Sequence, residues 1–152
     1  MDETLGFDTL LVPTDFSDMS HEAFERALKL ARGDDANVIL LHVIDPAYID
    51  FAERHGFVDK SDAMKQVRAR AESEMDEFVS GFDPPVKVTK MICEGTPFLQ
   101  IIDHARDLLV DAVIIGRVGS RGPLERLLFG STAEKVIRGC SRPVIVLPVE
   151  DE

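Results

Sequence analysis

The sequence predicts an α/β domain built around a mostly parallel β-sheet. Three observations predict this fold: apolar runs of strand length alternate with segments of helical spacing, the run Val38–Ile44 is continuous, and no linker or repeat divides the chain. Continuous apolar strands are typical of a parallel sheet that helices cover on both faces. Strict alternation of strands and helices favours right-handed crossovers between parallel strands. We therefore expect a single domain over residues 1–152.

Five segments have the length and apolar content of β-strands. In chain order they are Thr9–Pro13, Val38–Ile44, Val86–Ile92, Ala112–Gly116 and Pro143–Val149. The third alternates apolar and polar residues, which is typical of an edge strand. Loops of unusual composition follow the first and fourth strands, and ligands of parallel sheets bind beyond the carboxyl ends where the strand order reverses. The first and fourth strands should therefore be neighbours, which predicts the strand order 3-2-1-4-5.

Four segments between the strands carry apolar residues at helical spacing. Their expected starts are Ser17 or Ser20, Ser61 or Asp62, Thr96 with Pro97, and Ser131. The first of these helices should end near Gly33 and the second near Gly81. Residues 45–60 are irregular, and we expect a short helix or a mobile cover there.

Charge and composition exclude several classes of function. A net charge of −11 argues against nucleic acid or an anionic membrane surface as the main partner. The sequence has no apolar run of 18 residues, so no membrane span is expected. Its first residues are acidic and do not resemble a signal peptide, and Cys93 and Cys140 lack metal-ligand or redox spacing. These features favour a cytoplasmic protein with reduced thiols.

The clearest chemical signal lies between the fourth strand and the last predicted helix. This segment holds Gly116, Gly119, Gly122 and Gly130, together with Arg117, Arg121 and Arg126. Glycine lets backbone N–H groups approach an anion closely, and the N-terminus of the helix at Ser131 adds donors and a positive dipole end. Arginine pairs well with phosphate, although a solvated loop with chance arginines is the alternative. We interpret the segment as a phosphate cradle, which predicts nucleotide binding.

Four groups of residues resemble the universal stress protein family. They are Val12–Ser17, Val38–Val43, the glycine loop with Gly130–Ile137, and Arg142–Val146. The resemblance covers nearly the whole chain and keeps the order of the family's motifs. It implies a Rossmann-like, adenine nucleotide alpha hydrolase-like fold, which is a three-layer α/β sandwich with five parallel strands in the order 3-2-1-4-5. It also implies a homodimer that pairs through the fifth strand, at Val144–Val149.

Family members that bind ATP carry a glycine signature, which this chain matches with one departure. The signature is Gly, two residues, Gly, nine residues, Gly, then Ser or Thr, whereas ten residues separate Gly119 from Gly130 here. An alignment that starts at Gly119 leaves only seven residues between Gly122 and Gly130. We prefer the alignment that starts at Gly116, because it keeps this glycine directly after the strand. The extra residue leaves open which of Ser120, Arg121 and Gly122 touches phosphate.

The site residues follow from this resemblance and from the glycine loop. Those expected to bind the nucleotide are Pro13, Thr14, Asp15, Val43, Gly116, Arg117, Gly119, Arg121, Gly130, Ser131 and Thr132. The first three would contact the nucleoside, the backbone of Val43 would meet adenine, and Ser131 and Thr132 would bind a β- or γ-phosphate. The alternatives are a helix-capping role for Asp15 in a turn, strand packing for Val43, and a tight turn at Gly116 and Gly119.

Ser131, Glu134 and His42 also have local interpretations. Ser131 and Glu134 fit the capping-box pattern, in which Glu134 would return to the backbone N–H of the cap. His42 lies inside an apolar strand, and we expect a structural histidine there rather than a ligand or base.

ATP is the expected ligand, with AMP and ADP left open, and Mg²⁺ or Mn²⁺ would be held by phosphates and water more than by protein. The sequence has neither a lysine-containing phosphate loop nor a nucleophile elbow, so no catalytic residue is assigned. The first hypothesis is a dimeric, nucleotide-responsive regulatory module whose downstream partner the sequence does not indicate. The alternatives are a slow ATPase or autophosphorylating protein, and a nucleotide-free interaction module.

Overall fold

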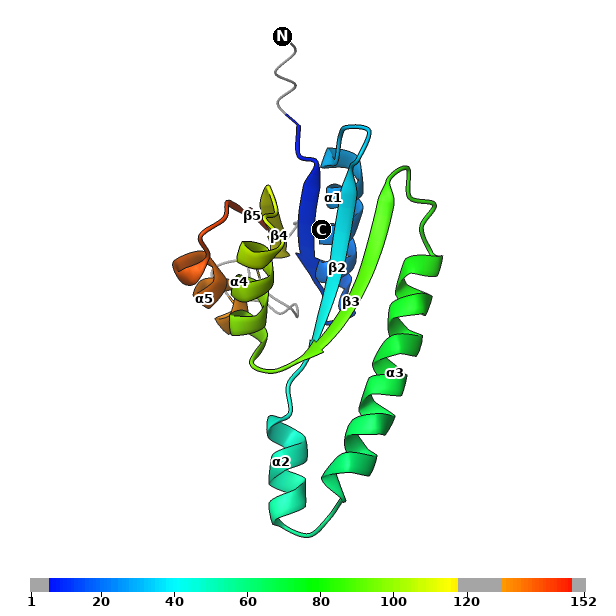
Figure 1. Ribbon diagram of the computed structural model, residues 1–152, viewed down its shortest axis with the longest axis vertical. Coiled ribbons are helices and arrows are strands. Elements are labelled where there is room, and N and C mark those ends of the chain that lie inside the picture. The colour runs from blue at the N-terminus through cyan, green and yellow to red at the C-terminus, as the bar shows by residue number, and fades with distance from the viewer. Residues whose placement is uncertain (1–5, 118–129, 149–152) are drawn as a thin grey trace.

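A five-stranded parallel sheet forms the centre of the computed structural model, which describes residues 6–117 and 130–148 (Figure 1). Its strands are β1 (Thr9–Pro13), β2 (Asn37–Ile44), β3 (Lys87–Glu94), β4 (Ala112–Gly116) and β5 (Val144–Leu147). They run in the order β3-β2-β1-β4-β5, and every neighbouring pair is parallel. The predicted fold class and strand order are confirmed.

Helices cover both faces of the sheet and complete a three-layer sandwich (Figure 1). The helices that the structure describes are α1 (Asp18–Leu30), α2 (Ala47–Arg54), α3 (Lys60–Ser80), α4 (Pro97–Asp107) and α5 (Ser131–Gly139). Buried side chains of α1 and α3 pack on one face, and those of α4 and α5 pack on the other. None of the described helices is long and apolar enough to cross a membrane.

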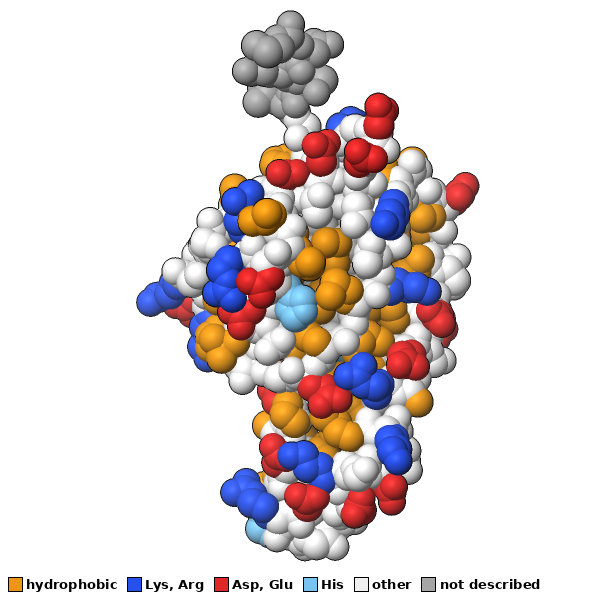
Figure 2. Space-filling view, in the orientation of Figure 1, with side chains coloured by type: hydrophobic (Ala, Val, Ile, Leu, Met, Phe, Trp, Pro, Cys, Tyr) orange, Lys and Arg blue, Asp and Glu red, His pale blue; other side chains and the backbone are white. Residues whose placement is uncertain are grey.

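The central strands are continuously apolar because both of their faces are covered. Leu10 and Val12 of β1 join the core beneath α1, whereas Leu11 joins the core beneath α4 and α5. All three side chains are fully buried. The edge strand β3 is only half-covered, and Figure 2 shows apolar side chains gathered on the open face between α4 and α3. Its alternating sequence therefore matches its edge position, as predicted.

The observed start of α1 agrees with the sequence, whereas α3 starts slightly earlier than predicted. Ser17 caps α1, because its Oγ accepts from the Ser20 N–H at 3.3 Å. The α3 helix starts at Lys60, one residue before the predicted range, because Asp59 caps it by accepting from the Asp62 N–H at 3.1 Å. Residues 45–60 contain α2, so the short helix is the correct one of the two expected alternatives.

The capping box predicted at the start of α5 is wrong. Gly130 occupies the N-cap position with no side-chain cap bond, and Ser131 is already the first helical residue. The carboxylate of Glu134 instead accepts from Arg138 at 2.8 Å, one turn further along the helix. Because the cap lies one residue earlier than expected, Ser131 has no cap role to fulfil.

The α2 helix and the first part of α3 project beyond the carboxyl ends of the strands (Figure 1). The α2 helix buries none of its residues, and Tyr48 is 85% exposed. An ion pair between Lys60 and Asp50 joins the two helices, and Arg68 pairs with Glu94 at the end of β3. Cys93 and Cys140 are both free thiols, as expected.

The C-terminus of α4 holds a leucine in a strained backbone conformation. Leu109 has φ +51°, its N–H donates to the Arg106 carbonyl at 3.2 Å, and the Val110 N–H donates to the Ala105 carbonyl at 3.3 Å. This hydrogen-bond pattern is the Schellman motif, whose left-handed position usually holds glycine because a β-carbon is unfavourable there. Leu109 is 72% exposed, so its side chain buries little apolar area.

We expect Leu109→Gly to increase the free energy of unfolding by about 0.5–1 kcal/mol, because glycine removes the left-handed strain. Urea denaturation measures the change. Leu108→Gly is the matched control, since the neighbouring leucine has an ordinary φ of −88° and its replacement should destabilise the protein. A destabilised Leu109→Gly variant would show that the strain at this position is unimportant.

Candidate functional site

A cavity of about 340 Å³ opens at the carboxyl edge of the sheet. It lies where β1 and β4 are neighbours, and where the chain leaves β1 toward one side of the sheet and β4 toward the other. Ligands of open parallel sheets bind at such reversals of strand order, because the two connections diverge and leave space between them. The position of the cavity is the one that the sequence predicts.

Most of the residues predicted to bind nucleotide line this cavity. They are Pro13, Thr14, Asp15, Val43, Gly116, Arg117, Gly130, Ser131 and Thr132. The other two predicted residues, Gly119 and Arg121, lie outside the described residues, as does the rest of 118–129. The cavity therefore brings together residues from opposite ends of the chain, and their contacts with a nucleotide stay a prediction.

The loop between β1 and α1 forms one wall, and a network of hydrogen bonds holds it in place. The buried Thr14 donates its N–H to the Leu41 carbonyl at 2.8 Å, and its hydroxyl bonds to that of Ser20 at 2.8 Å. Asp15 is exposed, and its Oδ1 accepts from the Ser17 N–H at 3.0 Å. Ser17 rather than Asp15 caps α1, so the helix-capping alternative for Asp15 is wrong. The carboxylate of Asp15 makes a turn contact at the edge of the cavity instead.

The opposite wall comes from the end of β4 and the start of α5. The Arg117 N–H donates to the Leu147 carbonyl at 3.1 Å, and the Gly130 N–H donates to the Arg117 carbonyl at 2.7 Å. The second bond joins the two ends of segment 118–129, so the exit of β4 lies directly beside the first turn of α5. The N–H groups of a first helical turn have no partner within the helix and attract anions.

The glycines of this wall have ordinary backbone angles. Gly116 is the last residue of β4, and Gly130 has φ −63° and ψ 150°. Among the glycines that the structure describes, positive φ occurs at Gly33, Gly56 and Gly95. Gly116 therefore does not adopt the positive φ that favours glycine, and a turn after β4 would lie in residues 118–129, outside the described residues.

An apolar floor separates the two polar walls. Leu41 and Val43 reach it from β2, and Ile115 reaches it from β4. Pro97 and Ile101 of α4 also line the cavity, although neither was predicted to do so. The sequence could have placed these two residues at the cavity, because α4 follows β3 directly and all parallel strands end at the same edge of the sheet. The cavity thus offers an apolar surface flanked by carboxylate, hydroxyl and backbone groups.

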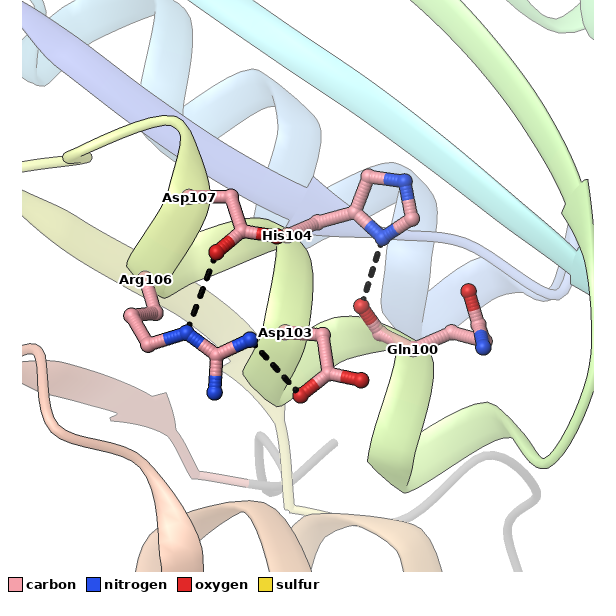
Figure 3. Close-up of polar contacts among 5 residues, drawn as sticks. All are labelled: Gln100, Asp103, His104, Arg106 and Asp107. Carbon is pink, nitrogen blue, oxygen red and sulfur yellow. Dashed lines mark hydrogen bonds and ion pairs between the residues drawn. The ribbon is translucent and has the colours of Figure 1, made fainter.

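A polar cluster on the described surface outside the cavity is paired within itself. On α4, Arg106 lies between Asp103 and Asp107, at 3.3 and 3.0 Å, and the ring of His104 lies apart from this trio (Figure 3). The described residues include no group of His, Cys, Asp and Glu that could hold a metal ion. Burial raises the pKa of the Cys93 thiol, which favours its protonated form.

Comparisons with known proteins agree with this architecture. The family model described as the universal stress protein family matches residues 6–148. The universal stress protein MJ0531 of Methanocaldococcus jannaschii is 30% identical over 142 residues, which cover 93% of this chain and 82% of that protein.

Solved structures show the same fold. That of MJ0577, from the same organism, has a TM-score of 0.79 at 29% identity and covers 95% of this chain and 98% of its own. A universal stress protein from Archaeoglobus fulgidus, solved in complex with dAMP, has a TM-score of 0.63 at 21% identity, with 91% and 95% covered. Together with the family match, these likenesses show that the chain belongs to the universal stress protein family.

Proposed function

We propose that this chain binds ATP in the cavity between β1 and β4, and that it acts in the cytoplasm as a dimeric, nucleotide-responsive regulatory module of a stress response. The observation that carries the proposal is the meeting of three different surfaces in one cavity. These are the Asp15 loop, the apolar floor, and the first turn of α5 beside the exit of β4.

Each surface suits a different part of an adenine nucleotide. The apolar floor at Leu41 and Val43 fits the flat base, and the carboxylate of Asp15 can accept hydrogen bonds from ribose hydroxyls. The backbone N–H groups at Ser131 and Thr132 can bind phosphate oxygens. A volume of about 340 Å³ lies within the usual range for small-molecule sites, roughly 300–1,000 Å³. The dAMP complex of the Archaeoglobus relative supports an adenine nucleotide as a ligand that this fold accommodates.

A divalent ion would accompany the triphosphate. Because the described residues hold no cluster of metal-binding side chains, the phosphates and water would supply most of the ligands to Mg²⁺ or Mn²⁺. Arg117, at the end of β4, lines the same cavity and would add positive charge near the phosphates.

We expect Gly130→Val to weaken ATP binding about tenfold or more, because a branched side chain at the N-cap of α5 would keep phosphate away from the first-turn N–H groups. Isothermal titration calorimetry with ATP, ADP and AMP, with and without Mg²⁺, measures the affinities.

Gly81→Val is the matched control for this substitution. Gly81 also lies at a helix end, has φ −76°, and leaves 3.9 Å between an added β-carbon and its nearest neighbour. This variant should bind ATP as the parent protein does. A Gly130→Val variant with unchanged affinity would show that the phosphates lie elsewhere. Release of less than one phosphate per protein over hours, from labelled ATP, would support a binding module over a slow ATPase.

We expect Asp15→Asn to weaken ATP binding about tenfold, since a neutral amide is a poorer acceptor for ribose hydroxyls than a carboxylate. Asp18→Asn removes the same charge three residues further on, at an exposed position outside the cavity. Equal losses of ATP affinity in both variants would show that the effect comes from net charge. Asp15 would then have no specific role in binding.

The proposed dimer uses the free edge of β5. In the ladder with β4, the Val113 N–H donates to the Pro143 carbonyl and the Arg117 N–H donates to the Leu147 carbonyl. Because inward and outward groups alternate along a strand, the N–H and C=O groups of Val144 and Val146 face the outer edge. All residues of β5 are half-buried, so a second strand would cover both apolar side chains and outward-facing backbone groups.

We expect Val146→Pro to convert the dimer into a monomer, because proline removes an outward N–H without breaking the ladder with β4. Analytical ultracentrifugation measures the mass. Val146→Ala is the control that shortens the side chain but keeps the N–H, and it should stay dimeric. A Val146→Pro variant that is dimeric and cooperatively folded would rule out edge pairing through β5.

A further inference from the structure

We propose that His42 is a positioning residue of the cavity, which holds the loop after β1 in the conformation that presents Thr14 and Asp15 to the ligand. The part of this inference that concerns nucleotide affinity rests on the proposed function. The part that concerns the loop itself can be tested without ligand. The sequence alone indicated only a structural histidine at this position.

The ring of His42 is anchored to the loop by a hydrogen bond. His42 is half-buried near the end of β2, and its Nδ1 lies 2.8 Å from the carbonyl oxygen of Thr14. A carbonyl oxygen can only accept, so Nδ1 carries the hydrogen and donates it. The bond joins residues 28 positions apart and closes the loop onto β2. It complements the bond from the Thr14 N–H to the Leu41 carbonyl.

The same ring supports an unfavourable backbone conformation. Phe16 has φ +66°, a left-handed conformation that is costly for a residue with a β-carbon. Its ring stacks on that of His42, with centroids 4.4 Å apart and planes at 28°. Its N–H donates to the hydroxyl of Thr14 at 2.9 Å. A strained backbone conformation persists only where several surrounding contacts hold it in place, and such residues concentrate at ligand sites.

These contacts hold the residue between them, Asp15, from both sides. Thr14 is bound through its carbonyl by His42, and Phe16 is held through its ring by the same side chain. The carboxylate of Asp15 therefore starts from a nearly fixed backbone, which lowers the entropy that a ligand must remove on binding.

A second histidine shows that a ring-nitrogen bond alone does not imply this role. The Nδ1 of His104 bonds to the Gln100 carbonyl at 2.7 Å, four residues earlier in its own helix (Figure 3). That contact is local and lies outside the cavity lining. His42 differs because it joins two separate segments that both line the cavity.

Two substitutions separate the functions of the ring. His42→Phe keeps an aromatic ring against Phe16 but removes the donor to Thr14, whereas His42→Asn keeps a donor near the position of Nδ1. Thr89→Val is the control, because it removes a half-buried side-chain bond to Asn37, 2.9 Å long, at the opposite end of β2. ATP affinity and the free energy of unfolding are measured for all three variants.

We expect His42→Phe to weaken ATP binding about tenfold and His42→Asn to stay within about threefold of the parent. Thr89→Val should lose stability but no affinity. Unchanged affinity in His42→Phe would overturn the proposal. An equal loss of ATP affinity in Thr89→Val and His42→Phe would also overturn the proposal, because the loss would then follow from reduced stability of the fold alone.

Measurements on the ligand-free protein test the loop independently of ATP binding. Nitrogen NMR of the parent protein should show His42 in the form protonated at Nδ1 when neutral. Hydrogen exchange of the Phe16 amide should accelerate about tenfold or more in His42→Phe but not in Thr89→Val. A proton on Nε2 alone, or unchanged exchange, would overturn the positioning role. A parent protein that fails to bind ATP but shows both signatures would refute the proposed function and leave the loop role supported.

Discussion

The parallel pairing of β1 with both β2 and β4 is the constraint on which the rest of this structure depends. Leu10 of β1 lies in register with Val38 on one side and with Ala112 on the other. The carboxylate of Asp111 reinforces the second pairing by accepting from the N–H groups of Asp8 and Thr9, each at 2.9 Å. With β1 in the middle, the helix after β1 packs on one face and the helix after β4 packs on the other. The cavity is the space that these diverging connections leave.

The two walls of the cavity are built by different physical means. The β1 wall is made rigid by bonds that converge on Thr14, whose N–H, hydroxyl and carbonyl are all engaged. The β4 wall presents backbone, because Gly116 and Gly130 place no side chain between a ligand and the start of α5. A fixed carboxylate on one side and accessible N–H groups on the other suit a ligand with a hydroxylated middle and an anionic end.

Much of this arrangement could be predicted from the sequence, because the signals are local. Continuous apolar runs such as Val38–Ile44 predicted the parallel sheet, and the unusual loops after the first and fourth strands predicted their adjacency. Asp15 and Ser131 were assigned to the site from motifs that resemble the family, and both line the cavity. Segment 118–129, including Gly119, is the part of the predicted cradle for which the structure provides no description.

By itself, the sequence determined which segments become strands and helices, since periodicity and the positions of glycine and proline act over a few residues. The tertiary structure decided what depends on distance in space. It set Gly130 rather than Ser131 as the cap of α5, and it brought Pro97 of α4 to the cavity. It also gave His42 a partner 28 residues away. A strand pattern shows that a histidine is half-buried, but only the folded sheet shows which carbonyl lies opposite its ring nitrogen.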